Sequence, residues 1–147
     1  MADQIYFEDI GEGDLLPEIT ERPTTTQLVH WAAAVGDFYP VHYDKDFAVG
    51  TGVPTVLVHG PFKHALLSRL VSSWAGPQAT VKRIACSFRG QDYPNQDLTV
   101  KGRVTGTRSE NGENLVELEI WSENESGEKT TPGSALVALP SRPAAQP

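Results

Sequence analysis

Apolar residues recur at helical spacing in a first segment around residue 30. Four of them fall on one face of a helix: Leu28, Trp31, Ala32 and Val35. Just before them, Thr24 and Gln27 match a capping box, in which each side chain satisfies a backbone donor at the helix start. Gly36 is a natural stop, because glycine adopts positive φ freely. The pattern predicts a helix over 25–35, preceded by an extended lead-in over 5–23.

A second apolar segment begins at Pro61, a residue that is well tolerated at the first position of a helix. Apolar side chains then follow on more than one face: Phe62, Ala65, Leu66, Leu67, Leu70, Val71 and Trp74. The pair Gly76-Pro77 ends the run. We expect a largely buried helix over 61–74, and a Gly-rich loop with one short helical turn over 43–58.

After the second helix the spacing changes from helical to alternating. Apolar and polar positions alternate in four runs: Ile84 to Phe88, Leu98 to Val104, Val116 to Ile120 and Leu136 to Ala138. The pairs Asn111-Gly112 and Ser126-Gly127 supply tight-turn chemistry between the later runs. One-sided alternation predicts an antiparallel sheet with one face on a core. Helices followed by a strand meander predict an α+β domain, with the second helix packed against the apolar face of the sheet.

Composition and charge narrow the class of protein. The 147 residues are expected to form one domain over 1–140, followed by a disordered Pro- and Ala-rich tail over 141–147. The net charge of −7 argues against binding to nucleic acid or to anionic membranes. The single cysteine, Cys86, excludes an intrachain disulfide and a multi-cysteine metal site. No segment is apolar enough to cross a bilayer and the N-terminus lacks a signal-peptide pattern, so we expect a cytoplasmic protein.

A carboxylate and an imidazole stand five positions apart directly after the first helix, at Asp37 and His42. Pro40 disfavours regular helix between them, so both groups are expected on irregular backbone. Acid–base sites are often built from such loop residues. Asp and His this close together are also ordinary turn and surface chemistry, and spacing alone leaves both interpretations open.

The start of the second helix is a further candidate. A helix N-terminus leaves backbone N–H groups unpaired and carries partial positive charge. Pro61 has no N–H, whereas Gly60 has one and lacks a Cβ, so a ligand can approach it closely. Such an end can bind an oxyanion or an enolate oxygen, or it can be a plain capping glycine before proline.

Other chemistry-bearing residues favour structural roles. His30 is expected to be a surface or packing residue, and Cys86 to face the core. His59 and His64 are five positions apart, which does not align them on one helical face as a zinc motif requires, so no metal site is expected. The chain contains no G-x-S-x-G elbow, GxGxxG fingerprint or P-loop, so serine hydrolase, dinucleotide and NTP chemistry are not indicated.

Together these motifs resemble the MaoC-like, or R-specific enoyl-CoA hydratase, branch of the hotdog-fold superfamily. The resemblance spans roughly 5–140 and rests on four elements: Tyr6-Phe7-Glu8-Asp9-Ile10, Gly36-Asp37-x-x-Pro40-x-His42-x-Asp44, His59-Gly60, and Phe88-Arg89-x-x-x-Tyr93-Pro94. It implies a long helix wrapped by an antiparallel sheet and paired into a dimer. It also implies a loop-and-helix segment over 24–56 that hangs over an acyl site.

The resemblance implies a hydro-lyase of lipid metabolism that adds water reversibly to a 2-enoyl thioester without a metal or redox cofactor. Asp37 and His42 match the acid/base pair of the family, and Gly60 matches its backbone oxyanion donor. Five residues around them are expected to bind the substrate: Tyr39, Val41, His59, Pro61 and Phe62. The acyl group would be carried on CoA or on an acyl-carrier protein.

One position departs from the family pattern. Tyr39 stands where the family usually has Asn before Pro40, which removes an amide and adds a large ring that would reshape the acyl pocket. The segment 73–77 also looks like subunits of heteromeric MaoC-like hydratases that process steroid side-chain CoA esters. A homodimer and a heteromer with another hotdog subunit therefore both stay open.

Two other functions compete with hydration. The chain could be a non-catalytic or partner-dependent hotdog subunit that completes the pocket of its partner. It could also be an acyl thioesterase, in which a carboxylate-activated water attacks the carbonyl. Five basic side chains on the predicted strands could meet phosphates, although a solvated strand face is the preferred explanation: Lys82, Arg83, Arg89, Lys101 and Arg103.

Overall fold

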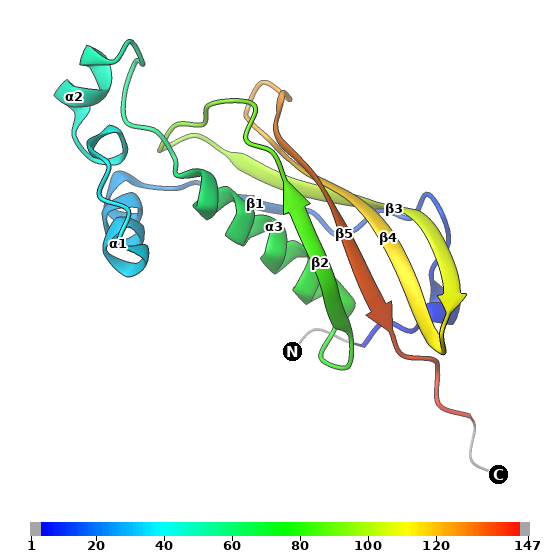
Figure 1. The fold of residues 1–147 in the computed structure, drawn as a ribbon. Helices are drawn as coiled ribbons and strands as arrows, with labels where there is room; N and C mark the ends of the chain where they lie inside the picture. Colours follow the sequence, from blue (N-terminus) through cyan, green and yellow to red (C-terminus); the bar gives the residue numbers. More distant parts are fainter. Residues whose placement is uncertain (1–3, 145–147) are drawn as a thin grey trace.

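The computed structural model describes residues 4–144 as one curved antiparallel sheet that holds a long helix, with a smaller helical lobe beside it (Figure 1). The helices are α1 (Thr25–Val35), α2 (Lys45–Gly50) and α3 (Gly60–Ala75), with single 3₁₀ turns at Phe7–Asp9 and Pro40–His42. The strands are β1 (Ile19–Glu21), β2 (Thr80–Cys86), β3 (Leu98–Glu110), β4 (Glu113–Glu123) and β5 (Lys129–Leu139). The expected α+β class is confirmed.

The five strands form one sheet in the order β1-β3-β4-β5-β2, and every neighbouring pair is antiparallel. The β3–β4 hairpin closes at Asn111 and Gly112, whose φ angles of 52° and 80° suit the tight turn that this pair predicts. Each of the four alternating runs falls on a strand, although Phe88 lies beyond the end of β2 and β1 lies in the expected lead-in. The strands extend well beyond these runs, because β3 continues through Thr105 to Glu110, where the side chains are mostly polar and exposed.

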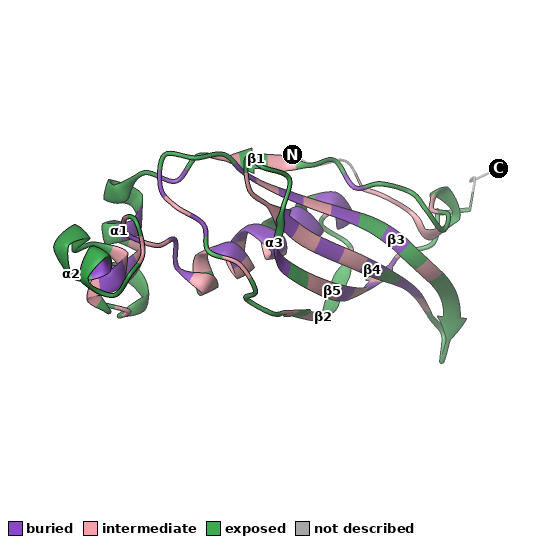
Figure 2. Cartoon of the chain, turned by 90° about the horizontal axis from the view of Figure 1, so that it is seen from above, coloured by how far each residue is buried: buried purple, intermediate pink, exposed green. Residues whose placement is uncertain are grey.

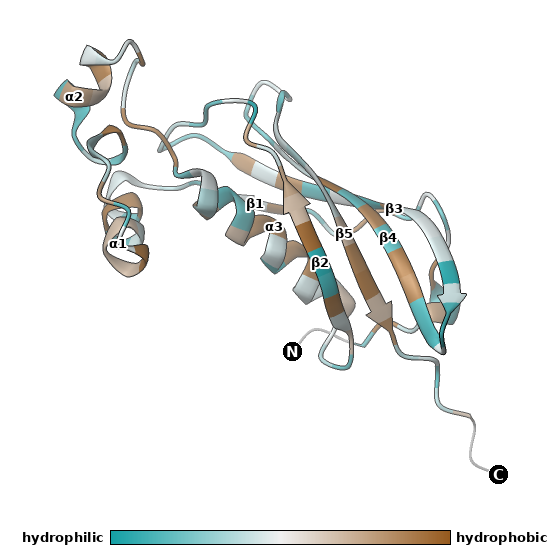
Figure 3. Cartoon of the chain, viewed as in Figure 1, coloured by the Kyte–Doolittle hydropathy of each residue, from teal (hydrophilic) through white to brown (hydrophobic). Residues whose placement is uncertain are grey.

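The core lies between α3 and the concave face of the sheet. Leu67 and Val71 of α3 are fully buried, as are Val100, Ile120 and Val137 of the sheet. Figure 2 shows buried residues along α3 and alternating along the strands, and Figure 3 shows apolar residues along the same elements. The expected helix over 61–74 is confirmed to within one residue at each end.

A second, smaller core belongs to the lobe that precedes α3. Leu28 of α1 and Ala48 of α2 are fully buried, and three valines of the connecting segments pack with them: Val41, Val56 and Val58. The expected capping box at Thr24 and the left-handed Gly36, with φ of 75°, both occur. Val35 was expected on the inner face but is 50% exposed, because it is the last residue of α1 and lies beyond the contact with this small core.

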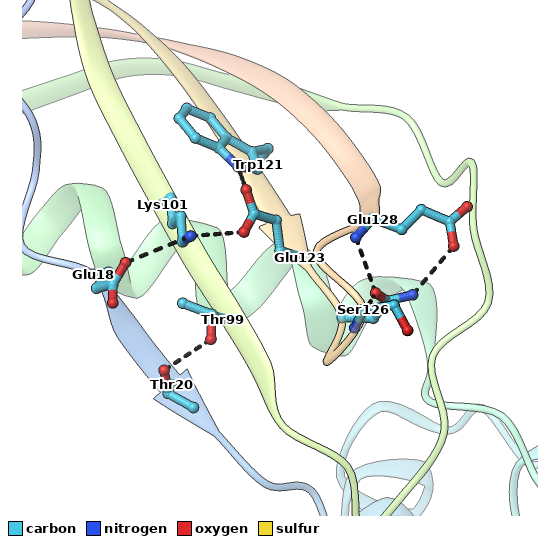
Figure 4. A network of polar contacts seen from close by, with 9 residues as sticks. Glu18, Thr20, Thr99, Lys101, Trp121, Glu123, Ser126 and Glu128 are labelled. Atoms are coloured by element: carbon cyan, nitrogen blue, oxygen red, sulfur yellow. Dashed lines mark hydrogen bonds and ion pairs between the residues drawn. The ribbon is translucent and has the colours of Figure 1, made fainter.

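The outer face of the sheet carries a network of ion pairs between exposed and half-buried side chains. Lys101 Nζ lies 2.7 Å from a Glu123 oxygen and 3.8 Å from one of Glu18 (Figure 4). Arg103 pairs with Glu119 at 2.7 Å, and Lys82 pairs with Glu113. Ion pairs at a solvated surface contribute little to stability, because water and salt screen them. Three of the five basic residues on the strands are thus matched by carboxylates, which fits a solvated face better than a phosphate site.

The C-terminal tail falls partly outside the described residues. The expected disorder over 141–147 covers residues 145–147, which are not described. Within the described part, Ser141 accepts a hydrogen bond from Asn114, and Arg142 pairs with Asp9 and lies over the ring of Tyr6. Over residues 4–144, no helix combines the length and apolarity that crossing a membrane requires.

Shortening a core side chain of α3 should destabilise the domain strongly. Leu67 is 0% exposed and lies at the centre of the main core. We expect Leu67→Ala to lower the free energy of unfolding by about 2–5 kcal/mol, because it removes apolar contacts and leaves a cavity. Urea denaturation measures the change. Leu15→Ala is the matched control, since Leu15 is 74% exposed, and a comparable loss in that variant would contradict this view of the core.

Candidate active site

The loop after α1 brings Asp37 and His42 together. Gly36 turns the chain sharply out of α1, so Asp37 is the first residue beyond the helix. Pro40 then begins the 3₁₀ turn that carries His42. This short turn brings the two side chains face to face: His42 Nε2 lies 3.9 Å from Asp37 Oδ2, with 13% and 37% of the respective side chains exposed.

The ring of His42 is fixed by its second nitrogen. Its Nδ1 lies 2.8 Å from the carbonyl oxygen of Leu57. A carbonyl only accepts, so Nδ1 carries the hydrogen, and in the neutral ring Nε2 presents a lone pair toward Asp37. The 3.9 Å between Nε2 and the carboxylate is too long for a direct hydrogen bond. Two acceptors that face each other at this distance can share one water, whose two O–H groups satisfy both.

A second imidazole lies directly behind the first. His59 stacks on His42 with ring centroids 3.8 Å apart and an interplanar angle of 20°. It is 0% exposed, and neither of its ring nitrogens has a hydrogen-bond partner within the described chain. Burial, together with the proximity of His42, lowers the pKa of His59 below its ordinary value of 6.5, although Asp37 opposes the shift. Burial therefore favours the neutral form of His59.

The N-terminus of α3 adjoins this stack. His59 is the N-cap residue and Gly60 the first residue of α3, and no side chain caps the helix start. His59 thus contacts His42 through its side chain and joins α3 through its backbone. The ring of Phe88 covers Gly60: its Cδ2 and Cε2 lie 2.9 Å from where a Cβ would be. A Cβ at this position would force the ring of Phe88 to shift.

The remaining expected residues are distributed around this centre. The ring of Tyr39 is 53% exposed and lies edge-on to Phe47 at 5.7 Å and to His42 at 6.3 Å. Val41 is buried in the smaller core, and Pro61 is exposed. Phe62 meets Trp31 edge-on at 5.3 Å, and these two rings line a 260 Å³ cavity between α1 and α3. The cavity is also lined by Glu21, Gln27 and Arg69, so only the part of its wall around the two rings suits an acyl chain.

A buried ion pair near the site is absent from the sequence predictions. Lys63 lies on the buried side of α3 and its Nζ contacts Asp92 Oδ2 at 2.7 Å. The signal was a lysine among the apolar residues of a helix expected to be buried. It was missed because the carboxylate that makes its burial tolerable lies 29 residues further along the chain.

The same three side chains could also be considered as ligands of a metal ion. Asp37, His42 and His59 each offer one ligand atom, and these atoms lie within 4.8 Å of one another. The lone pairs of an imidazole lie in its ring plane, and two rings stacked at 20° direct them nearly in parallel. A shared ion needs lone pairs that converge on one point. The arrangement therefore suits proton transfer better than metal binding.

Comparisons with known proteins identify the family of the chain. The sequence profile of the family described as MaoC like domain matches residues 11–125. The chain is 31% identical over 119 residues to the 3-oxo-4,17-pregnadiene-20-carboxyl-CoA hydratase beta subunit of Mycobacterium tuberculosis, covering 81% of this chain and 89% of that protein. It is 27% identical to the (R)-specific enoyl-CoA hydratase of Aeromonas caviae, covering 83% of this chain and 90% of that protein.

Solved structures show the same fold. The ChsH1-ChsH2 complex of Mycobacterium tuberculosis contains a chain that superposes with a TM-score of 0.78 at 28% identity, covering 88% of this chain and 98% of that chain. The (R)-hydratase of A. caviae superposes with a TM-score of 0.82 at 24% identity, covering 90% and 99%. The expected hotdog fold is thereby confirmed.

The depressed pKa of His59 predicts how stability depends on pH. The unfolded chain takes up a proton at this residue near pH 6.5, whereas the folded chain resists it, so protonation favours unfolding. The contribution of His59 to stability is complete above pH 6.5 and is lost as the pH falls below it. We expect His59→Gln to show a smaller loss in the free energy of unfolding between about pH 7.5 and 5.5 than the wild type.

Urea denaturation at the two pH values measures that difference. His30→Gln is the matched control, because it removes a titratable imidazole from an exposed position of α1. An unchanged pH dependence in His59→Gln, or an equal change in the control, would contradict the prediction.

Proposed function

The chain belongs to the MaoC-like domain family, and on that premise we propose that it is a hydro-lyase that adds water reversibly to the double bond of a 2-enoyl thioester. One observation carries the proposal. The carboxylate of Asp37 and the lone pair of His42 Nε2 face each other across 3.9 Å, beside the uncapped start of α3. We infer that the Gly60 N–H at this helix start serves the same site as the carboxylate and the imidazole.

Each group has a defined part in the addition. Asp37 and His42 accept hydrogen bonds from one water, and one of them takes its proton as the oxygen bonds to the β-carbon. Negative charge then develops on the thioester oxygen, where the N–H of Gly60 at the positive end of α3 stabilises it. A proton returned by the pair to the α-carbon completes the addition. Elimination of water follows the same steps in reverse.

The site residues use no resident cofactor in this scheme. The acid, the base and the oxyanion donor all come from the chain itself, and the thioester activates the double bond. Metal or redox chemistry is not required for the addition of water. We place the reaction in the cytoplasm, as the sequence predicts.

The substrate is an acyl thioester of CoA or of an acyl-carrier protein. Two relatives are named for CoA thioesters, which favours CoA. Tyr39 offers an aromatic ring next to His42, and Trp31 and Phe62 offer two more at the cavity between α1 and α3; we propose that the acyl group lies against these rings. The polycyclic acid in the name of the mycobacterial relative makes a bulky acyl group the first one to test.

The working assembly includes a second hotdog subunit. The mycobacterial relative is a beta subunit, and the similar solved structure is a complex of two named components. A heteromer is therefore the favoured arrangement, with a homodimer as the other. Hydration of crotonyl-CoA by the purified chain alone and with its partner separates a self-sufficient enzyme from a partner-dependent subunit. Release of free thiol without hydration would identify a thioesterase instead.

Removing either member of the catalytic pair should abolish most hydration. We expect Asp37→Asn and His42→Ala each to lower kcat by about 10²-fold or more, because each removes an acceptor of the water proton. The loss of crotonyl-CoA absorbance measures the rate. Asp46→Asn is the matched control, since Asp46 is an exposed carboxylate of α2 outside the pair.

Folding of each variant is checked by circular dichroism before the rates are compared. A folded Asp37→Asn or His42→Ala variant with the wild-type rate would overturn the assignment. A loss of similar size in Asp46→Asn would show that the lobe, and not the pair, is being disturbed.

A further inference from the structure

A buried ion pair lies one helical turn from the proposed oxyanion donor. Lys63 Nζ and Asp92 Oδ2 are 2.7 Å apart, and each side chain is 3% exposed. The ammonium also donates to the carbonyl of Gly90 at 3.0 Å. The second carboxylate oxygen, Asp92 Oδ1, is buried without a hydrogen-bond partner among the described residues. Charges are rarely taken this far out of water, and the proposed catalytic steps use neither group.

The ion pair joins α3 to the segment over 88–92, which we name the bridging segment. On one side, the N–H groups of Arg89 and Gly90 both donate to the carbonyl of Thr130 at 2.9 Å, which ties the segment to the start of β5. On the other side, Val58 donates its N–H to the carbonyl of Asp92 at 2.9 Å. Lys63 adds two charge-assisted bonds from the first turn of α3. The bridging segment therefore spans from the sheet to the start of the helix.

The bridging segment also touches the oxyanion donor. It begins at Phe88, whose ring lies against the Cα of Gly60 so closely that no Cβ fits between them. The ammonium of Lys63 lies 5.9 Å from the centre of that ring. A shift of the bridging segment therefore moves the surface against which the first residue of α3 rests. Small displacements of a catalytic group are costly, because a misplacement of about 1 Å can lower a rate 10²-fold.

We propose that Lys63 and Asp92 are positioning residues of the site: their buried ion pair holds the bridging segment against the start of α3 and so fixes the direction of the Gly60 N–H. The inference rests on the proposed function, because it assigns to Gly60 the role of oxyanion donor. Stability alone is a weak reason for such a pair, since apolar residues of similar volume often replace a buried ion pair at no net loss. Breaking only one partner, by contrast, leaves an isolated buried charge.

The test separates positioning from folding. Lys63→Met leaves the Asp92 carboxylate unpaired and should lower both Tm and kcat. The double variant Lys63→Met/Asp92→Asn has no isolated charge, so most of the Tm should return, while kcat stays about 10- to 100-fold below the wild type. KM should stay within about threefold, because the oxyanion contact strengthens only in the transition state. The matched control is Lys82→Met/Glu113→Gln, which removes an exposed ion pair from the same sheet.

A second readout needs no activity. In protein labelled with ¹⁵N-glycine, the Gly60 amide resonance is assigned by its loss in Gly60→Ala. Asp92→Asn keeps an oxygen near Lys63 but removes the charge, and it should shift that resonance. The Lys82→Met/Glu113→Gln control should leave it unchanged.

Three outcomes decide between the possibilities. Recovery of kcat together with Tm in the double variant would overturn the proposal and leave the pair a purely structural role. An unmoved Gly60 resonance in Asp92→Asn would overturn it as well. A wild-type assembly without hydratase activity would refute the proposed function instead, and the resonance would still report whether the ion pair orients Gly60.

Discussion

The burial of α3 against the concave face of the sheet is the constraint on which the site depends. Leu67, Leu70 and Val71 bury one face of the helix in the main core, so its rotation and its axial position are set by core packing. Its first residue, Gly60, therefore emerges at a defined point between the sheet and the smaller lobe. A backbone N–H can serve as a catalytic group only if the helix that carries it cannot slide or turn.

The lobe supplies the second half of the site, and its core is much smaller than the one that holds α3. Its small core consists of a few aliphatic side chains, and the proposed acid–base pair lies on loop and 3₁₀ backbone. Two contacts compensate for this: the bond from His42 to the carbonyl of Leu57, and the stack of His42 on the buried His59. Because His59 is covalently joined to Gly60, the stack fixes the position of the lobe relative to the helix that carries the proposed oxyanion donor. The positions of the Asp37 carboxylate, the His42 imidazole and the Gly60 amide are thus all fixed relative to α3.

The two sides of the sheet have separate tasks. Its concave face contacts α3 through apolar side chains, whereas its outer face carries exposed pairs such as Lys101 with Glu123 and Arg103 with Glu119. Such pairs add little to stability but keep a long sheet solvated. The strand β2 lies at one edge of the sheet, where the outer backbone groups of its seven residues stay available for a neighbouring subunit. In the proposed assembly, a second subunit could pair with this edge.

The sequence by itself determined the elements and the identity of the chemical groups, because both are written in local patterns. The capping box at Thr24, the stop at Gly36, the turn at Asn111-Gly112 and the alternation of the strands all depend on neighbours along the chain. Only the tertiary structure decided which groups meet across the chain: the stack of His42 on His59, the contact of Phe88 with Gly60, and the pairing of Lys63 with Asp92. No local pattern encodes these contacts, because they follow from where packing places α3 relative to the lobe and the bridging segment. For the same reason Val35 follows the helical pattern and is nevertheless exposed. The periodicity predicts which residues share a helix face, but it does not show whether another element packs against each of them.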